Sequence, residues 1–292
     1  MRNIICFLLI GLMIGCSSEV DLEQPAYDSK IVVDGWIEPD EPAHVFLTRS
    51  SPFLTQYDSA SIRASFLNYA KITLTTSSGE TEVLTLFREK GFFPPFVYKS
   101  VDIRGVVGLT YDIKIELSGH VVTASTTIPD PPVADMIWYD AQSDSSGLIN
   151  VKIHPSMTEQ SWLYTQVKGS KGSENYHPSY TPCYYLKPGH ESFDLPILRS
   201  RQTNLYLTDP MSHPYNKWPK YQYAIDDTVM VKVGAVDQQS YNVLKSLFAD
   251  QLSMENPFAF NGTSIVSNIN GGIGRWTGIA SAPVQVIYGQ AK

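Results

Sequence analysis

The sequence predicts a mainly β protein with two antiparallel β-sandwich domains, the second of which carries one amphipathic helix. Three observations lead to this prediction. Apolar and polar residues alternate with period two in segments of six to eight residues rich in Val, Ile, Thr and aromatic residues. Tight turns containing Ser and Gly separate neighbouring segments. A proline-rich break at residues 129–132 divides the segments into two sets, because proline cannot donate to a β-ladder.

The chain begins with a short apolar run. Arg2 supplies a positive charge, residues 4–14 are apolar but far fewer than the ~20 of a spanning helix, and Gly15 is a small residue before Cys16. This stretch resembles the lipobox of bacterial lipoprotein signal peptides. The resemblance implies that residues 1–15 are removed and that Cys16 is tri-acylated, which would hold the protein permanently in the membrane. The alternative is an ordinary signal peptide with an incidental Cys.

Composition excludes some classes of partner. Removing residues 1–15 takes away Arg2 and no acidic residue, which leaves 21 Lys and Arg against 29 Asp and Glu, a net charge of -8. Because no basic run exists to displace counterions, we expect no nucleic-acid partner. Only Cys183 remains as a free thiol beside the lipidated Cys16, so no intrachain disulfide can form.

Residues 16–29 are polar and acidic, and we interpret them as a tether. Acidic residues directly after the lipidated cysteine resemble the surface-export signal of Bacteroidota lipoproteins, although any linker could have this composition. The first sandwich is predicted over residues 30–128, with Ser77-Ser78-Gly79 and Ser118-Gly119 as tight turns. Its predicted strands are residues 30–37, 43–49, 70–76, 80–87, 110–117 and 121–128.

The second sandwich is predicted over residues 133–292, after the linker at 129–132. Residues 238–252 place apolar residues at helical spacing behind Asp237, a plausible N-cap, and predict one helix packed on a sheet. Each sandwich has enough strands to close a core, so we expect the two to fold separately. The predicted strands of the second are residues 134–140, 148–154, 162–168, 204–208, 228–236 and 284–288.

Four segments carry a resemblance to a known family: KIVVDGWI at 30–37, VFLTRSSPF at 45–53, GVVGLTYDIKIELSGHVVTASTTIPDPP at 105–132 and MENPFAFNGTSIVSNINGGIG at 254–274. In their order they resemble the Bacteroidota outer-membrane lipoproteins catalogued as domain of unknown function 4249. This family resembles accessory lipoproteins encoded beside TonB-dependent transporters. The resemblance implies a surface protein that helps a transporter collect a nutrient. It does not extend to residues 169–223 and carries over no catalytic residue.

No established catalytic or metal motif is present. The glycines at 271–274 follow no βαβ pattern and are interpreted as a turn between late strands. His177, Cys183 and His190 match no metal-site spacing, and the acidic pairs near turns lack the calcium-loop pattern. We therefore expect no cofactor, no metal and no enzymatic activity. The Asp58-Ser59-Ala60 triplet resembles the Bacteroidota O-glycosylation acceptor, which makes Ser59 a possible glycosylation site.

The region at 176–223 holds 8 of the 17 Tyr and 7 of the 19 Pro. Rigid aromatics on loops offer contact area at low entropic cost, so we predict a recognition surface here, with Tyr180, Tyr184, Tyr215 and Trp218 as contact residues. The alternative is a long excursion packed by its own aromatics.

The lipobox-like stretch and the family resemblance together imply an outer-membrane lipoprotein, lipid-anchored and facing the cell exterior, that serves a TonB-dependent nutrient transporter as accessory or ligand-capture subunit. A structural surface protein or adhesin is the first alternative. A glycan or peptide hydrolase is the second, because paired carboxylates can meet in space without a sequence signature.

Overall fold

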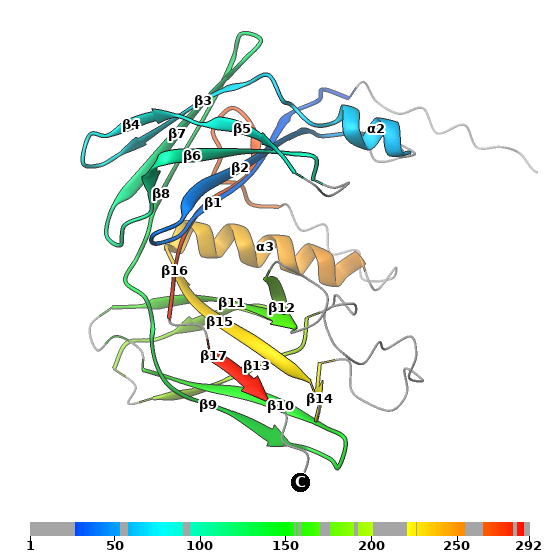
Figure 1. Cartoon of the computed structure of the whole chain (residues 1–292), viewed down its shortest axis with the longest axis vertical. Helices are drawn as coiled ribbons and strands as arrows, with labels where there is room; N and C mark the ends of the chain where they lie inside the picture. Colours follow the sequence, from blue (N-terminus) through cyan, green and yellow to red (C-terminus); the bar gives the residue numbers. More distant parts are fainter. Residues whose placement is uncertain are drawn as a thin grey trace, which may run out of the picture.

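The computed structural model describes residues 27–288 except 53–57, 90–93, 155, 157–158, 170–175, 190–191, 201–220, 226, 255–264 and 283–284. The fold is mainly β, and antiparallel sheets form two sandwiches (Figure 1), as the sequence predicts. The elements of the N-terminal part are β1 (Ile31–Ile37), β2 (Pro42–Arg49), α2 (Ser59–Ala64), β3 (Lys71–Thr76), β4 (Thr81–Val83), β5 (Thr85–Arg88), β6 (Phe96–Arg104), β7 (Thr110–Leu117) and β8 (His120–Thr127). They are followed by β9 (Val133–Ala141), β10 (Ser146–His154), β11 (Ser161–Gly169), β12 (His177–Leu186), β13 (Phe193–Ile197), β14 (Tyr223–Ala224), β15 (Thr228–Val236), α3 (Gln238–Met254), β16 (Ile273–Ser281) and β17 (Gln285–Tyr288).

The first sandwich packs the sheet β4-β3-β7-β8 against β5, β6, β2, β1 and β16. Strict alternation of buried and less buried residues along β1 and β7 sends every second side chain into one core. Ser118 and Gly119 both adopt a positive φ, the geometry of the two-residue turn that closes the β7–β8 hairpin. The predicted strands and turns of this region are therefore largely confirmed.

The sequence did not predict β6 or α2 in the first sandwich. Residues 80–87 also depart from the prediction, because the predicted single strand is two strands in different sheets. β4 pairs with β3, whereas β5 pairs with β6 in the opposite sheet. Leu84 lies between them, buried in the core, and its backbone N–H donates to the Ile72 carbonyl. The chain thus crosses from one layer of the sandwich to the other at a residue that fills the core.

One sheet of nine strands runs through both sandwiches in the order β12-β11-β15-β16-β1-β2-β6-β5, with β17 beside β15. Its central strand β16 pairs in parallel with β1 and antiparallel with β15. The prediction of a turn at 271–274 is right for Gly271 but wrong for Gly274, which lies within β16. A Cβ on Gly274 would come within 1.9 Å of the Val33 carbonyl oxygen, so only glycine permits this close parallel pairing.

This strand also corrects the predicted division of the chain. Residues 129–132 form no strand, but the segment after α3 returns to the first sandwich through β16 before β17 pairs with β15. Ile269, Trp276 and Ala280 lie in the core of the first. Because strand pairing depends on partners distant in sequence, periodicity alone could not assign β16 to the first core.

The second sandwich packs β11, β12 and β15 against β13, β10, β14 and β9. The region 176–223 was predicted as a loop excursion, yet its described parts contain β12, β13 and β14. β12 ends the nine-stranded order, and its register with β11 shifts between Tyr164 and Gln166. An edge position and a bulge tolerate prolines, which explains how Pro178 and Pro182 fit in a strand. The predicted strand at 204–208 lies outside the described residues.

Helix α3 lies between the two sandwiches (Figure 1), on the face of the nine-stranded sheet opposite the two cores. As predicted, Asp237 caps it: one carboxylate oxygen accepts from the Ser240 N–H at 2.6 Å. The other accepts from the Thr126 hydroxyl at 2.8 Å, which ties the helix to β8 of the first sandwich. A partly buried ion pair between Glu38 and Lys232 makes a second link. The sandwiches are thus joined by a shared sheet, a helix and side-chain bonds.

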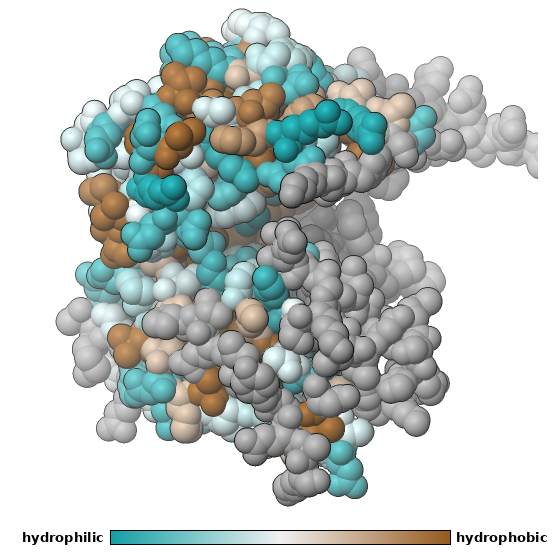
Figure 2. Space-filling model, in the orientation of Figure 1, coloured by the Kyte–Doolittle hydropathy of each residue, from teal (hydrophilic) through white to brown (hydrophobic). Residues whose placement is uncertain are grey.

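On the face in Figure 2, the hydrophobic side chains of the described residues lie in small patches among hydrophilic ones. None of the helices in the described ranges is both long and apolar enough to cross a membrane.

Candidate functional site

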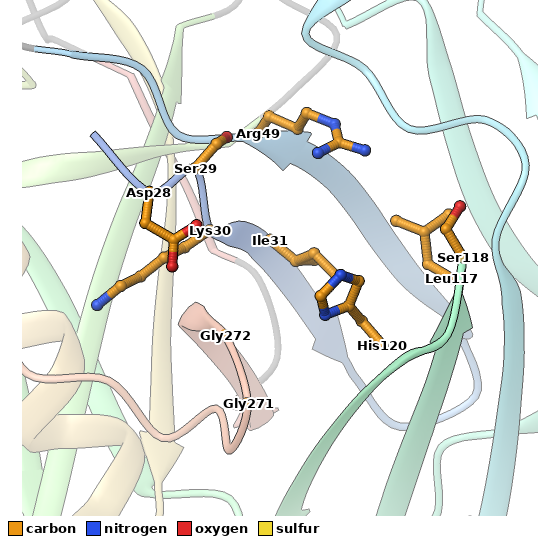
Figure 3. A pocket seen from close by; sticks show the side chains of 10 residues that line it. All are labelled: Asp28, Ser29, Lys30, Ile31, Arg49, Leu117, Ser118, His120, Gly271 and Gly272. Atoms are coloured by element: carbon orange, nitrogen blue, oxygen red, sulfur yellow. The ribbon is translucent and has the colours of Figure 1, made fainter. Parts of the chain in front are cut away.

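A half-open pocket of about 370 Å³ lies at the end of the first sandwich where the chain enters its first strand (Figure 3). Four segments meet there: the entry to β1, the end of β2, the β7–β8 turn and the turn before β16. Ile31 and Leu117 are buried beneath it. The residues that line it are Asp28, Ser29, Lys30, Ile31, Arg49, Leu117, Ser118, His120, Gly271 and Gly272.

Hydrogen bonds to Ser50 fix the entry segment that forms one wall of the pocket. The Lys30 N–H donates to the Ser50 hydroxyl at 2.8 Å, and the Ser29 hydroxyl donates to the Ser50 carbonyl at 2.9 Å. The adjoining wall at residues 271–272 needs glycine, since a Cβ on Gly272 would come within 2.7 Å of the Ile31 carbonyl oxygen. At the rim, Arg49 Nη2 donates to the Tyr69 hydroxyl at 3.2 Å.

The pocket is locally cationic although the chain carries a net charge of -7. Lys30 and Arg49 oppose the single carboxylate of Asp28, which gives the lining a net charge of +1 with His120 neutral. Guanidinium, ammonium and hydroxyl groups around an opening are suited to an anion such as a phosphate or carboxylate. The sequence prediction selected none of these residues, because their side chains converge only through the pairing of distant strands.

Of the predicted contact residues, Tyr215 and Trp218 lie outside the described residues. Tyr180 is half-buried on β12, and its N–H donates to the Leu198 carbonyl at 3.4 Å. Tyr184 packs against the second core, and its hydroxyl donates to the Pro196 carbonyl at 2.7 Å. Burial raises the pKa of Tyr184. The prediction that Tyr184 presents its ring to a partner is therefore at odds with the structure.

The neighbouring Tyr185 has the exposed ring that the prediction sought. It is 40% exposed, and its ring lies 6.5 Å from that of Trp162 on β11. Adjacent residues of a strand point to opposite faces, so Tyr185 points away from the second core, against which Tyr184 packs. A correct prediction of β12 would have selected Tyr185 as the exposed contact residue in place of Tyr184.

Ser59 is the first residue of α2, where the sequence predicted a loop. Asp58 caps this helix, since its carboxylate accepts from the Ser61 N–H at 2.7 Å. Cys16 lies outside the described residues. Glycosylation of Ser59 and acylation of Cys16 stay predictions.

Cys183 lies half-buried beside α3, and burial raises the pKa of its thiol to about 12. It therefore stays protonated at neutral pH and is a poor nucleophile. His177 lies at the start of β12, and burial lowers its pKa; His190 is outside the described residues. Within the described ranges, no three His, Cys, Asp or Glu side chains are grouped to hold a metal ion.

The outer face of β1 and β2 carries a stacked pair, Trp36 and His44, with ring centroids 5.1 Å apart. His44 Nδ1 lies 2.9 Å from the Pro42 carbonyl oxygen, so this nitrogen carries the proton and donates. Burial, and next the Lys99 ammonium, lower the pKa of His44. The imidazole is therefore neutral at physiological pH.

Comparison with known proteins gives one family match. The family model described as Domain of unknown function (DUF4249) matches residues 17–282. No curated protein matches the sequence. Among solved structures, a two-domain fibronectin type-III segment from chicken tenascin is 12% identical over 71% of this chain and 91% of that chain, with a TM-score of 0.19. Trypsin-activated alpha-2-macroglobulin from Escherichia coli is 9% identical over 74% of this chain and 15% of that chain, with a TM-score of 0.22. Neither superposition is close enough to support an inference.

Proposed function

The chain belongs to the family described as Domain of unknown function (DUF4249), and from this premise we propose that it is a lipid-anchored outer-membrane protein that serves a TonB-dependent nutrient transporter as accessory or ligand-capture subunit. The proposed role is binding rather than catalysis. The protein faces the cell exterior, where a transporter receives its ligand.

The observation that carries the proposal is the stretch Leu12-Met13-Ile14-Gly15-Cys16 and its distance from the first strand. Tri-acylation at Cys16 would make release from the membrane negligible. Fourteen residues, 17–30, separate the cysteine from β1, and even fully extended they span at most ~50 Å. The folded body would therefore stay near the membrane surface, within reach of an integral membrane partner.

The architecture supports a subunit that acts as one body. The nine-stranded sheet continues through both sandwiches, and α3 is capped by Asp237, which also binds β8. A partner that holds one sandwich therefore positions the other as well. Such coupling suits a protein that presents a surface at a fixed place beside a transporter.

Membrane attachment is tested by replacing Cys16 with Ser. We expect the wild-type protein to sediment with membranes after a high-salt wash and the C16S protein to become soluble, since no acyl chain remains. Retention of C16S on washed membranes would show that something other than a lipid anchor holds the protein.

The partner is tested by affinity purification of the tagged lipoprotein from detergent-extracted outer membranes. We expect a TonB-dependent transporter to co-purify with the wild-type protein and to be absent when an unrelated tagged lipoprotein is used. Recovery of fimbrial or matrix proteins without a transporter would favour the structural alternative and contradict the proposal.

A further inference from the structure

We propose that the pocket formed by Lys30, Arg49, Ser118 and His120 receives the phosphate of a lipid headgroup with a net negative charge and docks the first sandwich end-on against the membrane. This proposal rests on the proposed lipid anchor and extends it. The acyl chains would only keep the protein at the membrane, whereas the pocket would set its orientation.

The position of the pocket relative to the anchor is the first argument. One wall is made of residues 28–31, the first part of the fold after the tether. Eleven residues, 17–27, separate Cys16 from Asp28, so the pocket can lie no farther than ~40 Å from the anchored cysteine. The pocket is thus on the part of the fold that the tether keeps closest to the headgroups.

The charge of the pocket is the second argument. A chain of net charge -7 is repelled by an anionic lipid surface unless it presents a local cationic site. Lys30 and Arg49 supply two cations. Figure 3 shows the Arg49 guanidinium and the His120 ring on one side of the opening, with Asp28 and the Lys30 ammonium on the other. A phosphate on the Arg49 side would gain charge-assisted hydrogen bonds while avoiding the Asp28 carboxylate.

Exposed tyrosines beside the pocket are the third argument. Tyr69 is 58% exposed although it carries a large ring, and its hydroxyl accepts a hydrogen bond from Arg49. Tyr27, directly before the pocket wall, is 47% exposed. Tyrosine is enriched at membrane–water interfaces because its ring is apolar and its hydroxyl is polar. Cations and exposed tyrosines at one end of a sandwich fit a lipid surface better than a free ion.

End-on docking has a consequence for the rest of the molecule. The β7–β8 turn, which carries Ser118 and His120, stands at one extremity in Figure 1, and the second sandwich stands at the other. A headgroup in the pocket would therefore direct the second sandwich, including the exposed Tyr185, away from the lipid and towards a partner.

Vesicle flotation tests the proposal without the lipid anchor. The mature chain is used with Cys16→Ser, together with vesicles of phosphatidylcholine alone or mixed with phosphatidylglycerol. We expect flotation with the mixed vesicles and none with phosphatidylcholine. The double variant Lys30→Gln/Arg49→Gln should bind the mixed vesicles at least about tenfold more weakly, since each basic residue near an anionic surface contributes to partition.

The matched control is Lys152→Gln/Lys187→Gln, which also removes two positive charges, but from the second sandwich. This variant should float like the parent, and equal weakening of both double variants would overturn the proposal in favour of unspecific charge attraction. Tyr69→Ser changes no charge and should weaken flotation several-fold. Unchanged flotation of both Tyr69→Ser and Lys30→Gln/Arg49→Gln would also overturn it. Circular dichroism melts confirm that each variant is folded.

Free phosphate is the other source of the same chemistry. Titration with inorganic phosphate in the absence of vesicles should give no saturable binding at millimolar concentration. Saturable binding that is lost in Lys30→Gln/Arg49→Gln, with flotation unchanged, would assign the pocket to a soluble anion and refute the lipid. These outcomes are independent of the transporter purification, so failure of the pocket and failure of the proposed function can be told apart.

Discussion

Replacing Trp276 by Ala should lower the free energy of unfolding by about 4 to 6 kcal/mol. The residue comes from β16, yet its side chain is fully buried in the first core. Truncating a buried Trp costs about 3 to 5 kcal/mol. The indole Nε1 also donates to the Tyr111 carbonyl at 2.9 Å, and leaving that buried acceptor unpaired adds about 1 kcal/mol. The ring packs directly against Gly35, where a Cβ would lie 2.8 Å from Cε3, and Gly35 has no side chain to fill the space that truncation leaves.

Guanidinium denaturation of the mature Cys16→Ser chain, followed by far-ultraviolet circular dichroism, measures this loss. Trp36→Ala is the matched control, because Trp36 is only half-buried on the opposite face of the same sheet. We expect Trp36→Ala to cost about 1 to 2 kcal/mol, in proportion to the smaller apolar area it buries. A loss for Trp276→Ala below about 2 kcal/mol, or equal to that of Trp36→Ala, would refute the assignment of β16 to the first core.

Three further predictions follow from the same structure. Residues 27–130 expressed alone should bind a hydrophobic dye and unfold without cooperativity, because β16 is missing from their core. A cooperative melt would instead support the prediction from the sequence that the two domains fold independently. The free energy of unfolding should fall as pH is lowered from about 7.5 through 6.5, because the folded protein, in which the pKa of His44 is lowered, binds fewer protons than the unfolded chain. His44→Gln should reduce the slope of stability against pH in thermal melts. An unchanged slope would contradict the role of His44. Tyr185→Ala should leave the melting temperature within a few degrees while weakening transporter recovery, whereas Tyr184→Ala should cost about 3 kcal/mol of stability; the reverse pattern would contradict the assigned faces.

Much of the local structure could be predicted from the sequence. The alternation in β1, β3 and β7 and the Ser118-Gly119 turn specify strands and a hairpin through interactions between neighbours in the chain. The Asp237 cap of α3 is equally local. Where the strand assignments failed, the decisive contact was distant in sequence, whereas α2 was missed although its Asp58 cap is local. The proline and tyrosine content of residues 176–223 led to the prediction of a loop where β12 lies. A strand can contain these prolines because β12 is at the edge of its sheet.

The candidate pocket could not be predicted from the sequence. Its walls come from residues 28–31, 49, 117–120 and 271–272, and no spacing rule connects them. They meet because β1 pairs with β2 on one side and with β16 on the other, while the β7–β8 turn closes over the same end. A pocket made of strand ends depends on the order of strands in the sheets, whereas a sequence motif describes only residues that are close together along the chain.

By itself the sequence determined the class of fold, the family, and the positions of most strands and of the helix, because periodicity and turn chemistry act over a few residues. Only the tertiary structure decided which sheet each strand joins. It placed β16 beside β1, more than two hundred residues away in the chain, with Arg275 Nε donating to Asp34 Oδ1 at 2.6 Å. The physical reason is that alternation encodes which side of a strand is buried but not which strand lies beside it; that choice is made by the packing of the whole core.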